Sequence, residues 1–174
     1  MFLPYQEIKR LSLDPEVRLV EPFSERTEFA GVSYGCGPAS YDLRIDTDIT
    51  LWPGHSVRVD AIERIHMPPW LVGQMFSKST WARKHVEHAS TIIDPGFGWK
   101  SSGILRLEIN MHHGDEVIEI KAGTAIVQVL FSPLVKIHYN TIHIAETEQI
   151  YAGKYQGQGK DQDAIFQVSS KLVT

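Results

Sequence analysis

Residues 92–109 read IIDPGFGWKSSGILRLEI, and the second half of this stretch decides the fold. Apolar residues at positions 105, 107 and 109 alternate with Arg106, Glu108 and Asn110. An alternation of period two predicts a β-strand with one buried face. The Asp-Pro-Gly sequence that begins at Asp94 is typical of a turn. The stretch therefore predicts a Gly-rich hairpin followed by a strand with a charged outer face.

The same kind of pattern continues on both sides of this strand. Strands are predicted at 40–51, 56–67, 70–76, 104–112, 116–120 and 124–131, with Gly, Pro and Asp residues between them. Short helices are predicted at 4–12 and 78–85, and Ser77 or Ser79 is expected to cap the second. Many short strands separated by turns predict a mainly β fold, either a jelly-roll sandwich or a distorted β-barrel.

Length and composition predict one soluble domain over residues 1–174. The chain has 43% hydrophobic and 22% charged residues, and its net charge of −4 gives no basic surface for nucleic acid. It contains no apolar run of the ~20 residues that cross a membrane. The first residues, MFLPYQEIKR, lack the pattern of a secretory signal, so a cytoplasmic protein is expected. Residues 147–174 are polar and rich in Gly and Gln, which predicts a tail with little buried surface.

The single cysteine limits the metal chemistry. Cys36 cannot form an internal disulfide or a Cys-rich zinc site. Zinc nucleobase deaminases need a His-x-Glu together with a Pro-Cys-x-x-Cys, which this chain lacks. His85 and His88, with His112 and His113 further on, do not have the spacing of a zinc site. No metal is expected to be bound directly by protein side chains.

Residues 77–83, SKSTWAR, are candidates for binding an anion. They leave a predicted buried strand and enter a predicted helix, where unpaired backbone N–H groups, hydroxyls and the charge of Lys78 favour phosphate. Taken alone, the segment is explained better by a capped surface helix.

Five blocks of the chain, in the same order, resemble the dCTP deaminases, which share one β-rich superfamily with the trimeric dUTPases. The blocks are GPASYDLR (37–44), SKSTWAR (77–83), IDPGF (93–97) followed by LE (107–108), AGTAIVQVLFSPL (122–134) and GKYQGQ (153–158). The resemblance implies a distorted barrel or jelly roll of the dUTPase-like type. It also implies hydrolytic deamination of dCTP to dUTP and ammonia without zinc.

The resemblance also assigns roles to residues. Glu108 is implied to be the acid–base residue, Arg83 to orient it, and Ser79 to bond the attacking water. The implied substrate-binding residues are Lys78, Ser79 and Thr80 on phosphate, Asp94 on the deoxyribose 3′-hydroxyl, Arg83 and Arg106, and Tyr151, Lys154, Tyr155 and Gln158 closing from the tail. Mg²⁺ is expected to be bound with the triphosphate. Because family sites lie between subunits, a homotrimer or a larger assembly of trimers is implied.

Departures from the family pattern leave alternative substrates open. The chain reads Ser90-Thr91-Ile92 where the family commonly has Ala-Gly before Ile-Asp, and Lys78 stands where an arginine is usual. These changes allow dCMP, or a dCTP modified at C5 of the cytosine, as alternative substrates.

Other functions also stay open. In a dUTP diphosphatase, or in a bifunctional enzyme, Asp94 would help to activate water for attack on the α-phosphate. Trimeric dUTPases usually have a tyrosine where Phe97 or Trp99 stands here, and they do not need Glu108, so deamination is favoured. A catalytically silent nucleotide-binding member and a β-sandwich interaction module are further alternatives.

Overall fold

The computed structural model describes residues 1–101, 103–114 and 116–134. These residues form two short helices and twelve strands. The elements are α1 (Tyr5–Leu13), β1 (Val20–Glu21), β2 (Thr27–Phe29), β3 (Val32–Cys36), β4 (Tyr41–Arg44), β5 (Ile49–Leu51), β6 (Ser56–Ile65), β7 (Leu71–Ser77), α2 (Ser79–Ala82), β8 (Val86–His88), β9 (Ile92–Ile93), β10 (Ile104–Met111), β11 (Ile118–Ile120) and β12 (Ala125–Pro133). Neither helix has the length and apolarity that a membrane-spanning helix requires.

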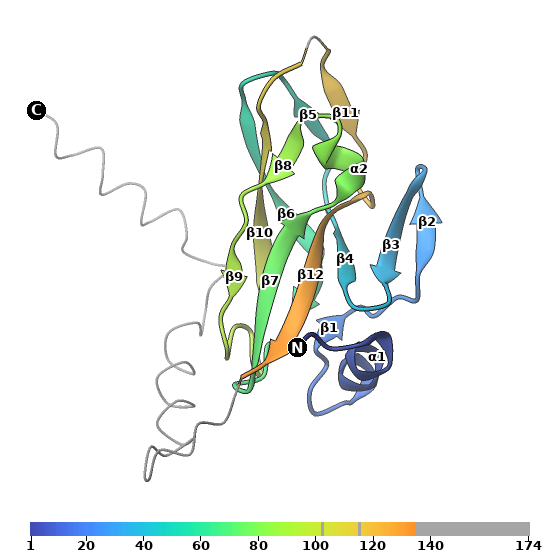
Figure 1. The fold of residues 1–174 in the computed structure, drawn as a ribbon, viewed down its shortest axis with the longest axis vertical. Helices are drawn as coiled ribbons and strands as arrows, with labels where there is room; N and C mark the ends of the chain where they lie inside the picture. Colours follow the sequence, from blue (N-terminus) through green and yellow to red (C-terminus); the bar gives the residue numbers. More distant parts are fainter. Residues whose placement is uncertain (102, 115, 135–174) are drawn as a thin grey trace, which may run out of the picture.

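The strands form three sheets whose pairs are antiparallel. Their orders are β1-β6-β10-β8, β11-β5 and β2-β3-β4-β12-β7-β9. In Figure 1, β6 and β10 lie behind β7 and β12. Buried side chains of these four strands belong to one apolar core, so the two larger sheets pack face to face. The mainly β prediction is confirmed, and the described strand orders form a distorted sandwich that does not close into a barrel.

One of the two longest predicted strands differs from the observed structure. Residues 40–51 form two strands, β4 and β5, because Asp46, Thr47 and Asp48 turn the chain between them. The Asp48 carboxylate accepts a hydrogen bond from the Ala122 backbone N–H at 2.8 Å, which fixes this turn against another loop.

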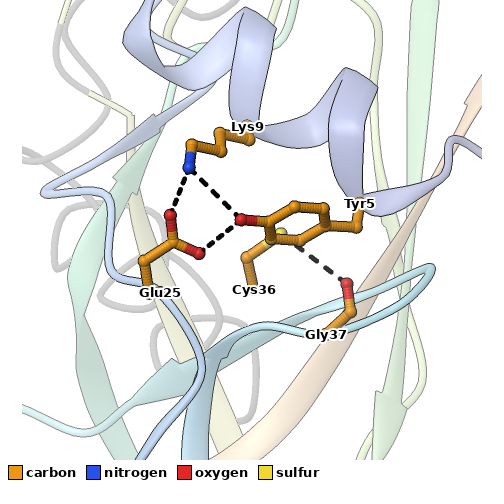
Figure 2. Close-up of polar contacts among 5 residues, drawn as sticks. All are labelled: Tyr5, Lys9, Glu25, Cys36 and Gly37. Carbon is orange, nitrogen blue, oxygen red and sulfur yellow. Dashed lines mark hydrogen bonds and ion pairs between the residues drawn. The ribbon is translucent and has the colours of Figure 1, made fainter.

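Helix α1 forms where the sequence predicted a helix. Both apolar and polar contacts hold it against the neighbouring strands. Ile8 and Leu11 are buried in the core. Tyr5 donates a hydrogen bond to Glu25 at 2.7 Å, and Lys9 donates to the same carboxylate at 2.6 Å. Figure 2 shows these residues together. Cys36 lies in the same region, and burial raises the pKa of its thiol to about 11, so the thiol stays protonated at neutral pH.

Helix α2 is a single turn and is shorter than the predicted 78–85. The N–H groups of Lys84 and His85 bond to carbonyls only three residues back, and His85 has a φ of 59°, which ends the helix. The predicted serine cap is wrong, because the N-cap residue is Lys78 and no side chain caps the helix. Ser77 instead accepts a hydrogen bond from the His88 backbone N–H at 2.8 Å.

Candidate active site

Strand β10 presents Glu108 on its outer face, as its alternation predicted. Leu107 and Ile109 on either side are fully buried, whereas about half of the Glu108 side chain is exposed. Strands β6 and β8 pair with β10 on its two sides. The carboxylate therefore projects from the middle of a paired sheet, whose backbone cannot move freely.

A cavity of about 280 Å³ opens beside this carboxylate. Its lining is Arg58, Met75, Thr91, Ile92, Ile93, Phe97, Ile104, Leu105, Arg106 and Glu108. Most of these side chains are apolar, and the charged ones come from β6 and β10. Ligand pockets measure roughly 300–1,000 Å³, so this cavity suits one ring of a ligand and not a whole nucleotide.

Two arginines share the rim with Glu108. The Arg58 Nη2 atom lies 4.0 Å from the Glu108 Oε1 atom, and Arg106 Nε donates a hydrogen bond to Asp60 Oδ1 at 3.0 Å. Arg106 was predicted from the sequence, whereas Arg58 was missed. The outward position of Arg58 in SVRVDAIERI was visible, but the strand register that places it opposite Glu108 was not.

The hairpin before β10 sets one wall of the cavity. Phe97, which lines the cavity, accepts a hydrogen bond from the Met67 N–H at 2.8 Å. A side chain at Gly98 or Gly103 would overlap the Ile65 carbonyl, so the hairpin backbone packs directly on the end of β6. This close contact holds Phe97 in place relative to β10.

Asp94 lies in the same hairpin, directly after β9. Its backbone carbonyl accepts a hydrogen bond from the Phe97 N–H at 3.1 Å, as expected for the first residue of a turn. The side chain is partly buried. Contact between Asp94 and a 3′-hydroxyl stays a prediction.

The SKSTWAR segment is anchored by two buried side chains. Trp81 donates a hydrogen bond from Nε1 to the Ala125 carbonyl at 2.8 Å. Lys78 is buried, and its ammonium forms an ion pair with the buried carboxylate of Asp42. This pairing is expected, because an ammonium removed from water needs a carboxylate partner. Its contact with phosphate stays a prediction.

The other predicted residues of this segment point to solvent. Ser79, Thr80 and Arg83 are all exposed. Within the described part of one chain, none of the three lines the cavity beside Glu108. The two predicted halves of the site are thus separate in the single chain. The tail residues Tyr151, Lys154, Tyr155 and Gln158 lie outside the described residues.

His88 connects the two halves. Its backbone N–H bonds to Ser77, which ends β7 just before α2, and it pairs with Ile109 in β10. Burial lowers the pKa of His88, while the nearby Glu108 carboxylate raises it by a smaller amount. Among residues 1–101, 103–114 and 116–134, no three His, Cys, Asp or Glu side chains are grouped so that they could hold a metal ion.

Comparisons with known proteins agree with this architecture. A family model described as dCTP deaminase-like matches residues 44–134, more than half of the 174 residues. A dCTP deaminase of Pyrococcus horikoshii is 27% identical over 169 residues, covering 88% of this chain and 92% of the relative. A deoxyuridine 5′-triphosphate nucleotidohydrolase of Anaeromyxobacter sp. is 29% identical over 103 residues, covering 58% of this chain and 67% of the relative.

The fold is also similar to solved structures. The crystal structure of 2′-deoxycytidine 5′-triphosphate deaminase from Agrobacterium tumefaciens matches with a TM-score of 0.57 and 18% identity, over 75% of this chain. This chain spans about half (47%) of the length of the Agrobacterium protein. The matching segment 44–134 contains β10 with Glu108, the hairpin and the SKSTWAR segment. The chain belongs to the dCTP deaminase-like family.

Proposed function

We propose that this protein deaminates a deoxycytidine nucleotide by hydrolysis, converting dCTP to dUTP and ammonia. The observation that carries the proposal is the position of Glu108, a half-exposed carboxylate on a rigid strand at the rim of a cavity of ring size, which apolar and charged side chains line together. The family match and the relatives that bear the name dCTP deaminase support the same reaction.

Glu108 acts as the acid–base residue of this reaction. The carboxylate accepts a proton from a water molecule while the water oxygen attacks C4 of the cytosine, and it passes this proton to the ring nitrogen N3. Glu108 then takes the second proton, from the hydroxyl now on C4, and delivers it to the amino group, which leaves as ammonia while the C4=O bond of uracil forms. One water is consumed, one ammonia is released, and the carboxylate returns to its starting state.

The remaining substrate contacts come from a neighbouring subunit in a homotrimer or a larger assembly of trimers. The exposure of Ser79, Thr80 and Arg83 supports this arrangement, because these side chains are available to a second chain. Arg83 orients Glu108 and Ser79 bonds the water, while Thr80 and Lys78 contribute to phosphate binding. Mg²⁺ enters as part of the triphosphate substrate. Tyr151, Lys154, Tyr155 and Gln158 close over the triphosphate.

Diphosphatase activity on dUTP is the second candidate, alone or combined with deamination. The similarity to a deoxyuridine 5′-triphosphate nucleotidohydrolase favours it, as does Asp94 in the turn after β9. In that reaction Asp94 helps to activate water for attack on the α-phosphate, and dUMP and pyrophosphate are the products.

One assay separates these functions. The purified protein is incubated with Mg²⁺ and dCTP, dCMP, a C5-modified dCTP or dUTP, and ammonia, dUMP and pyrophosphate are measured separately. We expect ammonia from a deoxycytidine nucleotide, with dCTP as the preferred substrate. Pyrophosphate from dUTP without any ammonia from a cytosine nucleotide would refute deamination and support the second candidate. Both products together would identify a bifunctional enzyme.

A further inference from the structure

The hairpin before β10 carries Phe97 into the wall of the cavity. Its first turn is bonded to Met67, whose N–H donates to the Phe97 carbonyl at 2.8 Å and whose carbonyl accepts a hydrogen bond from the Gly96 N–H at 3.1 Å. These bonds join backbone groups and do not depend on the side chains at these positions. The next residue of the hairpin, Gly98, is bound differently, because a side chain reaches its carbonyl oxygen.

That side chain is His66, which is 3% exposed and lies directly after β6. Its Nδ1 atom is 3.1 Å from the Gly98 carbonyl oxygen, and its Nε2 atom is 3.2 Å from the Oε2 atom of Glu21, the last residue of β1. A carbonyl and a carboxylate both accept hydrogen bonds, so a proton on either ring nitrogen has an acceptor. One buried ring therefore joins β1 to the hairpin that forms the cavity wall.

The Gly98 carbonyl is well placed to fix the hairpin. It also accepts a hydrogen bond from the Ser101 N–H at 3.0 Å, which closes the turn at the hairpin tip. A Cβ atom at Gly98 would lie 2.3 Å from the Ile65 carbonyl oxygen, so the backbone already touches the end of β6 on one side. The His66 ring holds the same carbonyl. Because Gly98 follows Phe97 directly, these contacts restrict the movement of Phe97 as well.

The two contacts of the ring differ in their exposure to water. The Gly98 contact is buried, whereas the Glu21 side chain is 46% exposed, and the Arg18 Nη1 atom lies 3.5 Å from its Oε2 atom as well. Water can take the place of a donor at the exposed carboxylate, whereas loss of the buried donor leaves a lone pair of the carbonyl unsatisfied. Loss of the ring should therefore disturb the hairpin more than loss of Glu21.

We propose that His66 is a positioning residue, which fixes the Phe97 wall of the cavity through the Gly98 carbonyl. The inference rests on the proposed function, in which the cavity receives the ring of a deoxycytidine nucleotide. His66 is not among the described residues that line the cavity, so it acts on the substrate through the hairpin. Its effect should fall on binding of the ring more than on the chemical step, because Glu108 stands on a different element, β10.

A double-mutant cycle tests whether His66 acts through Phe97. His66→Leu removes both ring contacts, and we expect it to raise KM for dCTP about tenfold while kcat changes less than about twofold. In a Phe97→Ala background the same substitution should change KM little, because effects that pass through one shared residue are not additive. Equal increases of KM in the two backgrounds would overturn the proposal.

Two further variants accompany this cycle. Glu21→Ala, a change at a half-exposed side chain, should raise KM about two- to threefold, again only when Phe97 is present. This variant carries the same cycle if His66→Leu does not fold. His55→Leu is the matched control, because the Nδ1 atom of exposed His55 also lies 3.1 Å from a carbonyl oxygen, that of Pro53, outside the cavity lining. Its KM should equal that of the unaltered protein.

The position of the hairpin has a readout that needs no substrate. Trp99, two residues after Phe97, packs edge-on against Trp70, with ring centroids 5.5 Å apart and an interplanar angle of 76°. Near-ultraviolet circular dichroism reports the fixed packing of aromatic rings, and Trp99→Phe identifies the signal of this pair. His66→Leu should change the signal, and His55→Leu should leave it as it is.

The outcomes separate the role of His66 from the proposed reaction. An unchanged Trp99 signal in His66→Leu would overturn the positioning role, whichever nucleotide the protein turns over. A changed signal with an unchanged KM would also overturn it, because the hairpin would then have moved without affecting the substrate. A changed signal in a protein that releases no ammonia from any deoxycytidine nucleotide would uphold the hold of His66 on the hairpin and refute the proposed deamination.

Discussion

The Glu108 region and the SKSTWAR region are built in opposite ways. Glu108 stands on a strand that is paired on both sides, next to a formed cavity. Ser79, Thr80 and Arg83 stand on a single helical turn and face solvent, although Trp81 and Lys78 anchor that turn from below. Glu108 lines a cavity, whereas the exposed hydroxyls and guanidinium of the SKSTWAR region do not line it in the described part of one chain. We propose that the two regions are complementary half-sites, which meet between subunits.

Removing the carboxylate is expected to have the largest effect. Glu108→Gln should lower kcat for ammonia release about 10³-fold, because the amide cannot accept a proton from water. Its stability to urea should stay nearly unchanged, since the side chain is half exposed. Glu119→Gln, an exposed glutamate on β11, is the matched control. Full activity in Glu108→Gln would contradict the catalytic role of Glu108.

Mixing variants tests whether the half-sites come from different chains. Glu108→Gln and Arg83→Ala subunits are co-expressed with different tags, and assemblies that carry both tags are purified. Every mixed cyclic trimer then contains one site with both native residues, so about one third of the wild-type activity should return. Mixed trimers no more active than the two variants would show that Glu108 and Arg83 do not cooperate across a subunit boundary.

The buried pair beneath α2 should matter more for stability than for chemistry. Asp42→Ala leaves the Lys78 ammonium buried without its carboxylate, and we expect a loss of about 3–5 kcal/mol in the free energy of unfolding. Urea denaturation measures it. The double variant Asp42→Leu with Lys78→Met should recover most of the loss. A fully stable Asp42→Ala would contradict the anchoring role of this ion pair.

A substitution at Trp81 tests the second contact that anchors helix α2, the hydrogen bond to the Ala125 carbonyl. Trp81→Phe keeps a buried ring but leaves the Ala125 carbonyl without its donor, which should cost about 1–3 kcal/mol. Trp52→Phe, at a side chain that is 54% exposed, is the control and should change stability little. Equal stability of the two variants would contradict the anchoring role.

The smallest effect is expected from pH acting on His88, which joins the two regions. Because burial lowers the pKa of His88 in the folded chain, the unfolded chain binds a proton more readily. The pKa of histidine in the unfolded chain is about 6.5. Above this pH the neutral ring of His88 makes its full contribution to the free energy of unfolding, and the contribution declines as the pH falls below it. Urea unfolding between pH 7.5 and 5 should show a decline that is weaker in His88→Gln. An identical decline in both proteins would exclude His88 as its source.

The sequence was most informative where one face of a strand is buried. The alternation around Glu108 predicted both the strand and the outward carboxylate, because a period of two follows from the backbone itself. The order of strands within the sheets could not be read in this way, so Arg58 was missed although its own strand was predicted. Register depends on contacts between segments far apart in the chain.

The SKSTWAR segment was harder to predict because its side chains compete for several partners. The residue types favoured a capped helix and a lysine available to phosphate. The fold instead uses Ser77 to hold β8 and uses Lys78 to neutralise Asp42, a residue 36 positions earlier. Contacts between residues so far apart in the chain leave no pattern in the local sequence. Strands as short as β1 and β9, with two residues each, likewise have no period to detect.

The contact of Gly98 and Gly103 with the end of β6 has a consequence for how this protein can change. The base of the hairpin is fixed there, while Lys100 and Ser101 lie beyond it and are exposed. We expect that a change at Lys100 or Ser101 would leave the ring of Phe97 in place, because the glycine contacts fix the base of the hairpin. This tip is therefore a suitable place to attach a label without altering the wall of the cavity.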